Sequence, residues 1–480
     1  MIDKERMMRM SRRSFAATAL VGAALGAMGV GARAAEYAGA GLRLMPVVGR
    51  GRIFGTTLTD LAARGYVEEE YLLSGEAERY GVAGVLNPDG KWTLTPGERR
   101  PYVTRLYVRR PKDPKQFNGT ILVEWLNVSL GFDVGFLDGD GLYDGFAYVG
   151  VTPQYGGVIG EGDMPQGLKS WDAERYAMLV HPGDDWSYDI FTQAGRALRA
   201  NSARGHPLHG FRVKKLIGAG LSQSGSRILA YANGVQPLAR TYDALMPMLC
   251  AGAAAPFEGG AAPGVAAARA RPLFTRVRDD LSVPAMQLNT EFEAPFFRPN
   301  RQPDTPSYRS WEVAGASHGP AELLKIIHGK EDRDGVGSRW HAFDAASNVS
   351  WQPTSDAAIH HVHRWLAGGP PPPAQPPIAF EADGKTISRD AHGNAMGGVR
   401  LPELQVPIAS YRGQGTKHFL AGETHPFATD ELKRLYPNHM DYVDRVTTAA
   451  NAALAAGVIL PARAEEYAAQ ARAADIPPTN

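Results

Sequence analysis

Short, nearly continuous apolar runs recur through the middle of the chain. The four clearest runs are residues 119–127 (GTILVEWLN), 146–154 (FAYVGVTPQ), 213–220 (VKKLIGAG) and 283–290 (VPAMQLNT). Runs of this kind are typical of strands that are buried on both faces. We therefore expect all four to lie inside a sheet that is covered on both sides.

Helical spacing appears between these runs. In residues 187–201, Ile190, Ala194 and Ala197 recur at the interval that places side chains on one face of a helix. Strands that alternate with helices favour a parallel α/β sheet. The sequence thus predicts a core over residues 101–367, built as a mostly parallel sheet flanked by helices.

The segment before this core, residues 36–100, alternates short apolar stretches with Gly and Pro. Here GYVEEEYLLSG (65–75), and just beyond it RPYVTRLYVRRP (100–111), predict strands with one face in water. We therefore expect N-terminal strands at the margin of the core.

A proline-rich stretch, residues 368–377 (GGPPPPAQPP), can be neither helix nor central strand. It predicts a linker to a C-terminal extension, residues 378–480, packed on the core. That extension ends in two predicted helices, around 439–456 and 461–474. Gly457 stands where the first would stop, and Pro461 suits the first turn of the second.

A further insertion separates two of the predicted core strands. Residues 250–274 are rich in Ala and Gly, and the whole insertion extends to about residue 282. In an α/β core such a segment forms either a cap over the site or loop filler, and the sequence leaves both readings open.

The N-terminus has the three-part pattern of an export signal. A basic start is followed by an apolar run over residues 16–30 and by Ala32-Arg33-Ala34, which suits cleavage after residue 34. Within it, SRRSFA (11–16) is similar to a twin-arginine signal. The apolar run is shorter than the roughly 20 residues that span a bilayer. We therefore expect a periplasmic or secreted protein with no membrane contact after signal removal.

Bulk composition fits a globular protein with one large domain or two. The 480 residues are 44% hydrophobic and 21% charged. Without residues 1–34 there are 45 basic and 48 acidic side chains, a net charge of −3. Nucleic acid is therefore not an expected partner. Cys250 has no second cysteine to pair with, so stability must come from the core.

Three serines lie within five positions of LIGAGLSQSGSRILAYANG, residues 216–234. An apolar strand precedes them and a helix follows, which is typical of the strained turn that exposes a nucleophilic serine. The predicted strand ends at Gly220, so the apex falls at Ser222, while Ser224 belongs to the start of the helix. We therefore predict Ser222 as the nucleophile.

A serine nucleophile needs a base and an acid, which in such folds follow in the order Ser, acid, His. His318 follows the predicted strand in SYRSWEVAGASHGP (307–320) and is the candidate base. The acid should follow the strand at 283–290, where Glu291 and Glu293 both stand. Counting from the strand end favours Glu293, but the sequence leaves the choice open.

Backbone N–H groups are the predicted oxyanion donors. One is that of Gln223, directly after the nucleophile at a helix start. The second should come from Asn127 or Val128, in the loop after the strand at 119–127.

Two features resemble metal sites but favour simpler readings. The acidic loop with Asp138, Asp140 and Asp144 lacks the later ligands of a calcium loop, so a solvated loop is the better interpretation. His360 and His363 share a helix face without a nearby carboxylate or cysteine, which favours a surface helix over a zinc site. We expect no metal and no organic cofactor.

With these residues in place, the chain resembles the α/β-hydrolases, and more narrowly the bacterial "alpha/beta hydrolase domain-containing" family. The resemblance runs from about residue 45 to the C-terminus. It rests on GYVEEEYLLSG, ILVEWLNVS, HPGDDWSYDIFTQ, GLSQSGSR, VPAMQLNTEFE, VAGASHG and GNAMGGVRLPELQVPIASYRG.

The resemblance implies a serine hydrolase with Ser222, His318 and a glutamate as the catalytic triad. Serine stands where a second glycine often follows the nucleophile, and glutamate stands where aspartate is the commoner acid. We expect hydrolysis of a small-molecule carboxylic ester through an acyl-enzyme. The alternatives are an acyltransferase with the same triad and a non-catalytic binding protein with a hydrolase fold.

Overall fold

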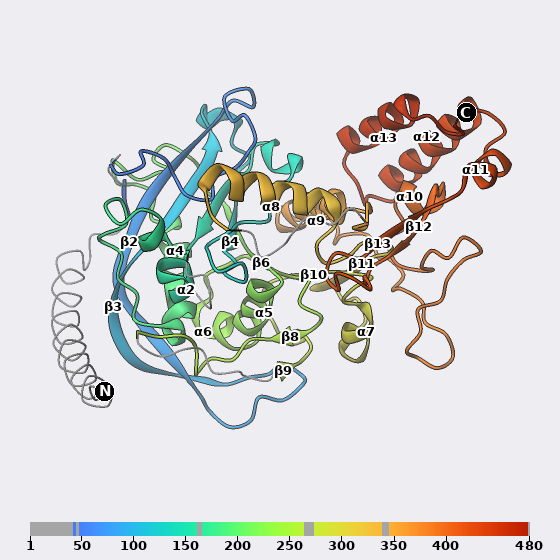
Figure 1. The fold of residues 1–480 in the computed structure, drawn as a ribbon. Coiled ribbons are helices and arrows are strands. Elements are labelled where there is room, and N and C mark those ends of the chain that lie inside the picture. The colour runs from blue at the N-terminus through green and yellow to red at the C-terminus, as the bar shows by residue number, and fades with distance from the viewer. Residues whose placement is uncertain (1–41, 45–47, 161–165, 264–272, 338–344, 479–480) are drawn as a thin grey trace, which may run out of the picture.

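A single large sheet organises the core of the molecule, as Figure 1 shows for the computed structural model. The structure describes residues 42–44, 48–160, 166–263, 273–337 and 345–478. The predicted export signal, residues 1–34, lies outside the described residues.

Nine strands form this sheet within the described part of the chain. In spatial order they are β1 (Leu42–Leu44), β2 (Tyr66–Val82), β3 (Leu94–Pro111), β5 (Ala147–Val151), β4 (Thr120–Trp125), β6 (Lys215–Leu221), β7 (Ala244–Met248), β10 (Ala285–Thr290) and β11 (Tyr308–Val313). The six from β5 to β11 are parallel, and β1, β2 and β3 pair antiparallel. The predicted, mostly parallel sheet is confirmed, and the carboxyl ends of the six parallel strands share one edge.

Both faces of this sheet are covered, as the apolar runs predict. In β4, Ile121 and Val123 belong to the core beneath α4 (Ser187–Arg199) and α5 (Gln223–Ala230). The intervening Leu122 belongs to the opposite core, beneath α8 (Ala321–Asp334) and α9 (Gln352–Leu366). Because successive side chains of a strand point to opposite faces, a continuous apolar run satisfies both cores at once.

Strands β2 and β3 form a longer ribbon than the sequence predicts. β5 pairs only with residues 106–109 of β3 and Val103 bridges to Val180, so the part of β3 before Val103 is an edge, where Pro96 and Pro101 are tolerated. The expected wet face is wrong for the later part of β3, where Arg105 and Arg109 are buried. Carboxylates of the neighbouring segments pair with both arginines, which makes their burial possible.

The C-terminal extension contains α10 (Pro402–Gln405), β12 (Ala409–Arg412), β13 (Glu423–Pro426), α11 (Thr429–Leu435), α12 (His439–Ala455) and α13 (Pro461–Ala473). The two helices predicted at its end correspond to α12 and α13. Gly457 follows α12 with φ at +72°, a conformation that glycine adopts without strain.

The extension is joined to the sheet by backbone hydrogen bonds. The Val399 N–H donates to the Glu312 carbonyl at 2.7 Å, and the Ala314 N–H donates to the Val399 carbonyl at 3.0 Å. In the proline-rich stretch, the Pro373 carbonyl accepts from the indole N–H of Trp311 at 2.8 Å. These bonds place the extension beside β11, at the right of the sheet in Figure 1.

Short elements complete the described chain. They are η1 (Pro114–Gln116), η2 (Asp140–Tyr143), α2 (Tyr155–Ile159), α3 (Leu168–Trp171), η3 (Asp184–Trp186), η4 (Tyr231–Val235), α6 (Gln236–Ala239), β8 (Ala253–Ala254), β9 (Leu273–Phe274), α7 (Ala294–Phe297) and η5 (Arg298–Asn300). Strands β8 and β9 pair within the insertion predicted as a cap or filler, of which residues 264–272 lie outside the described part. Among the helices described, none has the length and apolar character needed to cross a bilayer.

Candidate active site

Ser222 occupies the turn between β6 and α5, at the carboxyl edge of the sheet. Its backbone has φ +62° and ψ −119°, which a non-glycine residue adopts only under strain. The turn leaves no room for side chains at two flanking positions. A Cβ at Gly220 would lie 2.6 Å from the Ser224 carbonyl oxygen, and one at Gly225 would lie 2.2 Å from that of Met248.

The two serines of this turn have different surroundings. Ser224 is buried, and its hydroxyl donates to the Leu221 carbonyl at 2.9 Å, which stabilises the turn from within. The hydroxyl of Ser222 instead lies 2.8 Å from the Nε2 atom of His318. Of the two serines, therefore, Ser222 is the one next to a base.

His318 lies in the loop after β11 and connects the serine to a carboxylate. Its Nδ1 atom is 2.6 Å from the Oε1 atom of Glu293, and its side chain keeps 14% of its surface exposed. The ring thus has the serine at one nitrogen and a buried carboxylate at the other. A carboxylate at Nδ1 favours the tautomer with the proton on Nδ1, which leaves Nε2 free to accept a proton.

Glu293 is fixed by the end of the neighbouring strand. Its Oε2 atom accepts the backbone N–H of Thr290 at 2.9 Å and the hydroxyl of the same residue at 2.6 Å. The carboxylate is therefore oriented by three donors, two on one oxygen and the imidazole on the other.

Glu291, the second acid that the sequence allows, does not contact His318 in any hydrogen bond described. Its carboxylate accepts the N–H groups of Gly315 and Gly413 and pairs with Arg389 at 2.7 Å. It thus links the His318 loop to the C-terminal extension. The physical reason is the turn: β10 ends at Thr290 and residues 291–293 form a turn with Glu293 in a helical conformation, so the two carboxylates do not keep the common direction of alternate strand residues.

The two predicted donors in the loop after β4 differ in availability. The Asn127 N–H donates to the Val134 carbonyl at 2.8 Å, so the backbone of Asn127 is already engaged and its prediction as a donor is wrong. Its side chain instead donates to the Leu221 carbonyl at 2.9 Å, directly before Ser222. Among the described contacts, the Val128 N–H makes no backbone hydrogen bond.

Gln223, the other predicted donor, is the first residue of α5. An N–H at this position has no carbonyl one turn earlier in the helix to bond. It also lies at the positive end of the helix dipole, which favours an anion there. The N–H groups of Gln223 and Val128 are thus the two predicted donors that the geometry leaves available.

Sequence reasoning missed several residues that hold this arrangement. Thr290 orients Glu293, and Phe292 places its ring 5.5 Å from the imidazole of His318, centroid to centroid. Arg389 supports Glu291 from the C-terminal extension. Thr290 precedes the two predicted acids in the sequence and Phe292 lies between them, but only the folded chain brings Arg389 to them.

Cys250 is not a reactive nucleophile in the folded protein. Its thiol is buried, and this burial raises its pKa to about 12. At neutral pH the group is therefore a protonated thiol rather than a reactive thiolate.

The two features that resemble metal sites form ordinary contacts. Asp138 pairs with Arg109 at 2.6 Å, and Asp140 pairs with Arg64 at 2.5 Å. His360 and His363 contact the Gly141 carbonyl and the Thr120 hydroxyl, at 2.8 and 2.7 Å. In the described ranges, no group of three or more metal-ligating side chains comes together.

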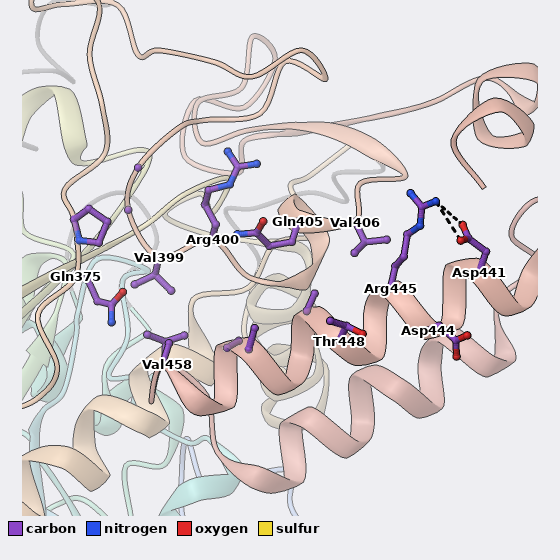
Figure 2. Close-up of a pocket in the computed structure, with 17 residues that line it drawn as sticks. Gln375, Val399, Arg400, Gln405, Val406, Asp441, Asp444, Arg445, Thr448 and Val458 are labelled. Atoms are coloured by element: carbon purple, nitrogen blue, oxygen red, sulfur yellow. Dashed lines mark hydrogen bonds and ion pairs between the residues drawn. The ribbon is translucent and has the colours of Figure 1, made fainter. Parts of the chain in front are cut away.

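A cavity of about 800 Å³ lies in the C-terminal extension, between α12 and residues 397–406 (Figure 2). Small apolar side chains of α12 form much of its wall, and Arg445 pairs with Asp441 at its rim, at 2.9 Å. Neither Ser222 nor His318 lines this cavity. It is therefore separate from the serine site.

Comparison with known proteins agrees with the fold described above. The family model described as "Alpha/beta hydrolase domain" matches residues 38–469. No curated protein matches the chain.

Solved structures with similarity include the esterase Est22 (12% identity, TM-score 0.30), an arylesterase (13%, 0.28) and the glucuronoyl esterase from Solibacter usitatus (12%, 0.27). The alignments cover 62%, 54% and 52% of this chain and 81%, 81% and 76% of the respective structures. At these TM-scores the three structures add nothing to the assignment, which rests on the family model over nearly the whole chain. The chain belongs to the alpha/beta hydrolase domain family.

Proposed function

We propose that this protein is a carboxylic ester hydrolase with Ser222 as its nucleophile. The observation that carries the proposal is the hydrogen-bonded series from Ser222 through His318 to Glu293, with distances of 2.8 and 2.6 Å. Its expected substrate is a small-molecule ester.

The proposed reaction begins when the Ser222 hydroxyl attacks the acyl carbon. His318 Nε2 takes the hydroxyl proton, and Glu293 stabilises the imidazolium that results. His318 then gives this proton to the oxygen of the departing alcohol, which leaves an acyl group on the serine. The same imidazole then takes a proton from a water molecule, whose oxygen attacks the acyl carbon. The bond to Ser222 breaks, the carboxylic acid leaves, and the imidazole returns the proton to the serine oxygen.

The N–H groups of Gln223 and Val128 are the proposed oxyanion donors. Both belong to the backbone, so their positions are fixed before substrate arrives. One donor of this kind typically contributes on the order of 10²–10³ in turnover. Asn127 serves as a positioning residue, because its amide holds the carbonyl that precedes the nucleophile.

A fluorophosphonate probe tests the proposal directly. We expect it to label the wild type covalently, and we expect Ser222→Ala to abolish both labelling and hydrolysis of p-nitrophenyl acetate. Ser226→Ala is the matched control, since this serine lies in the first turn of α5 and contributes its backbone N–H to the Ser222 carbonyl at 2.9 Å. We expect the control to keep its labelling.

Two results would contradict the proposal. One is labelling that persists in Ser222→Ala, since another side chain would then be the nucleophile. The other is a wild type that is neither labelled nor able to hydrolyse graded p-nitrophenyl esters, which would favour a binding protein.

We also propose export of the folded protein through the twin-arginine route. The support is the basic, apolar and small-residue order of residues 1–34, with Arg12 and Arg13 in the twin-arginine motif. Replacing both arginines by lysine should retain the precursor inside the cell. Unchanged export of that double variant would contradict this route.

A further inference from the structure

Three phenylalanine rings form a cluster beside His318. The ring of Phe292 meets the imidazole at a centroid distance of 5.5 Å and an angle of 62°. Phe292 also contacts Phe296 at 6.0 Å and Phe419 at 4.9 Å. We call Phe292, Phe296 and Phe419 the aromatic cluster. It extends the apolar surroundings of the imidazole outward from the site.

The outer members of the aromatic cluster face solvent. Phe296 is 42% exposed and Phe419 is 54% exposed, whereas Phe292 is buried. Two large apolar side chains that pack on one buried ring but stay partly exposed do not contribute their full hydrophobic stabilisation to the fold. An exposed apolar patch that adjoins a reactive site is typical of a ligand-binding surface.

The position of the aromatic cluster is set by two distant parts of the chain. Phe292 follows β10, and its N–H donates to the Thr290 hydroxyl at 3.1 Å. Phe419 comes from the loop between β12 and β13. That loop is fixed where the Gly319 N–H donates to the Leu420 carbonyl, at 2.8 Å. Both anchors adjoin triad residues, so the cluster keeps its place relative to His318.

The chemistry of the proposed reaction says which part of an ester this surface would meet. The imidazole that takes the serine proton must hand it to the oxygen of the departing alcohol. That oxygen therefore lies next to His318 Nε2, and the rest of the alcohol extends along the surface beside the imidazole. The aromatic cluster adjoins the same ring.

We propose that the aromatic cluster binds the alcohol portion of the substrate, and that this portion is an aromatic or similarly bulky apolar group. The inference rests on the proposed function, because it takes the direction of the leaving group from it. Apolar burial against the two exposed rings drives the contact, and edge-to-face packing favours an aromatic ring over an alkyl chain.

Two esters with one acyl group test the proposal. The measurement is acid release from benzyl acetate and from methyl acetate, expressed as the ratio of their kcat/KM values. We expect Phe419→Ala and Phe296→Ala each to lower this ratio by about two- to tenfold, the usual effect of one aromatic contact. Leu238→Ala is the control, since this exposed side chain lies on α6, which leads to the amino end of β7.

A second series separates the alcohol side from the acyl side. With benzyl alcohol held constant, acetate and hexanoate esters should keep the same ratio in wild type and Phe419→Ala. A change in this acyl ratio, with no change in the alcohol ratio, would overturn the proposal and place the aromatic cluster on the acyl side.

A binding measurement keeps this test distinct from that of the proposed function. Saturation-transfer NMR of benzyl alcohol with Ser222→Ala needs no turnover, and adding Phe419→Ala should weaken the signal. If the wild type hydrolyses no ester, the proposed function fails, and this measurement still decides the inference. If the signal of the double variant equals that of Ser222→Ala, the proposal that the aromatic cluster is a binding surface is wrong.

Discussion

Glutamine substitutions at Glu291 and Glu293 separate two carboxylates that stand two positions apart. Glu293 is 2.6 Å from His318 Nδ1, whereas Glu291 binds the backbone of Gly315 and Gly413. Glutamine has nearly the volume of glutamate, so neither substitution opens a cavity. The two variants therefore differ in hydrogen bonding rather than in packing.

The surroundings of Glu293 decide how a glutamine would orient there. The Oε2 position receives two donors from Thr290, and the Oε1 position receives one from His318. The amide oxygen must therefore face Thr290, and the amide NH₂ must face Nδ1. His318 then accepts at Nδ1 and carries its proton on Nε2, where it cannot take the proton of Ser222.

The expected loss follows from this change of tautomer. In a serine triad, an acid-to-amide change of this kind lowers kcat by about 10⁴, or about 5 kcal/mol of transition-state stabilisation. The free energy of unfolding of Glu293→Gln should change little, because the amide oxygen keeps both hydrogen bonds from Thr290.

Glu291→Gln should show the opposite pattern. It removes the charge that faces Arg389 and keeps an acceptor for only one of two backbone N–H groups. Hydrogen bonds to charged groups are worth about 1.5–3 kcal/mol, so we expect a loss of stability in that range. Activity should fall far less than in Glu293→Gln.

Initial rates on p-nitrophenyl acetate and urea unfolding measure the two effects independently. If Glu293→Gln keeps more than a tenth of the wild-type kcat, the assignment of Glu293 as the triad acid is wrong. If Glu291→Gln loses activity to the same degree without loss of stability, the separation of roles is wrong.

Three further predictions concern the protein beyond the triad. Cys250, whose burial raises its pKa to about 12, should react with a disulfide reagent at pH 8 only after unfolding, and rapid reaction of the native protein would contradict this. Arg105→Ala leaves the buried Glu70 and Asp133 without their shared cation, and should lower the free energy of unfolding by about 3–5 kcal/mol in urea titrations. A loss below 1 kcal/mol would show that water reaches these carboxylates. Burial raises the pKa of Glu403 from 4.5 to about 7, so the folded state favours its protonated form. Its contribution to stability is complete below pH 4.5 and is lost as the pH rises through 7. Glu403→Gln imitates the protonated form, and should flatten the fall in Tm between pH 5 and pH 8. An equally steep fall in the variant would contradict the assignment.

The core strands and the place of the serine turn were predictable from local patterns. Runs such as 119–127 and 213–220 are nearly continuous in apolar residues because both faces of β4 and β6 are covered. The step from strand to helix at Ser222 is likewise encoded within a few residues, where close contacts require glycine at positions 220 and 225. Local sequence is sufficient when the physical cause is itself local.

Other features depend on segments far apart in the chain. From the sequence alone, Arg105 is expected to face solvent, because no neighbouring residue in the chain indicates that Glu70 and Asp133 pair with it. The choice between Glu291 and Glu293 depends on where β10 ends and how the chain turns after it, which sequence-based boundaries do not resolve. The engagement of the Asn127 N–H depends on Val134, across a turn that the pattern does not reveal.

The C-terminal extension helps to hold the candidate site, although a proline-rich linker separates it from the core in the sequence. The loop from Ala314 to Gly319 places His318, and each end of this loop is held by the extension. At one end, Val399 accepts the Ala314 N–H, and at the other, Leu420 accepts the Gly319 N–H. Between them, Glu291 ties Gly315 to Gly413 of the extension. A histidine must hold its geometry within a fraction of an ångström to exchange a proton with serine. A hundred residues that contribute none of the proposed triad thus fix the position of His318.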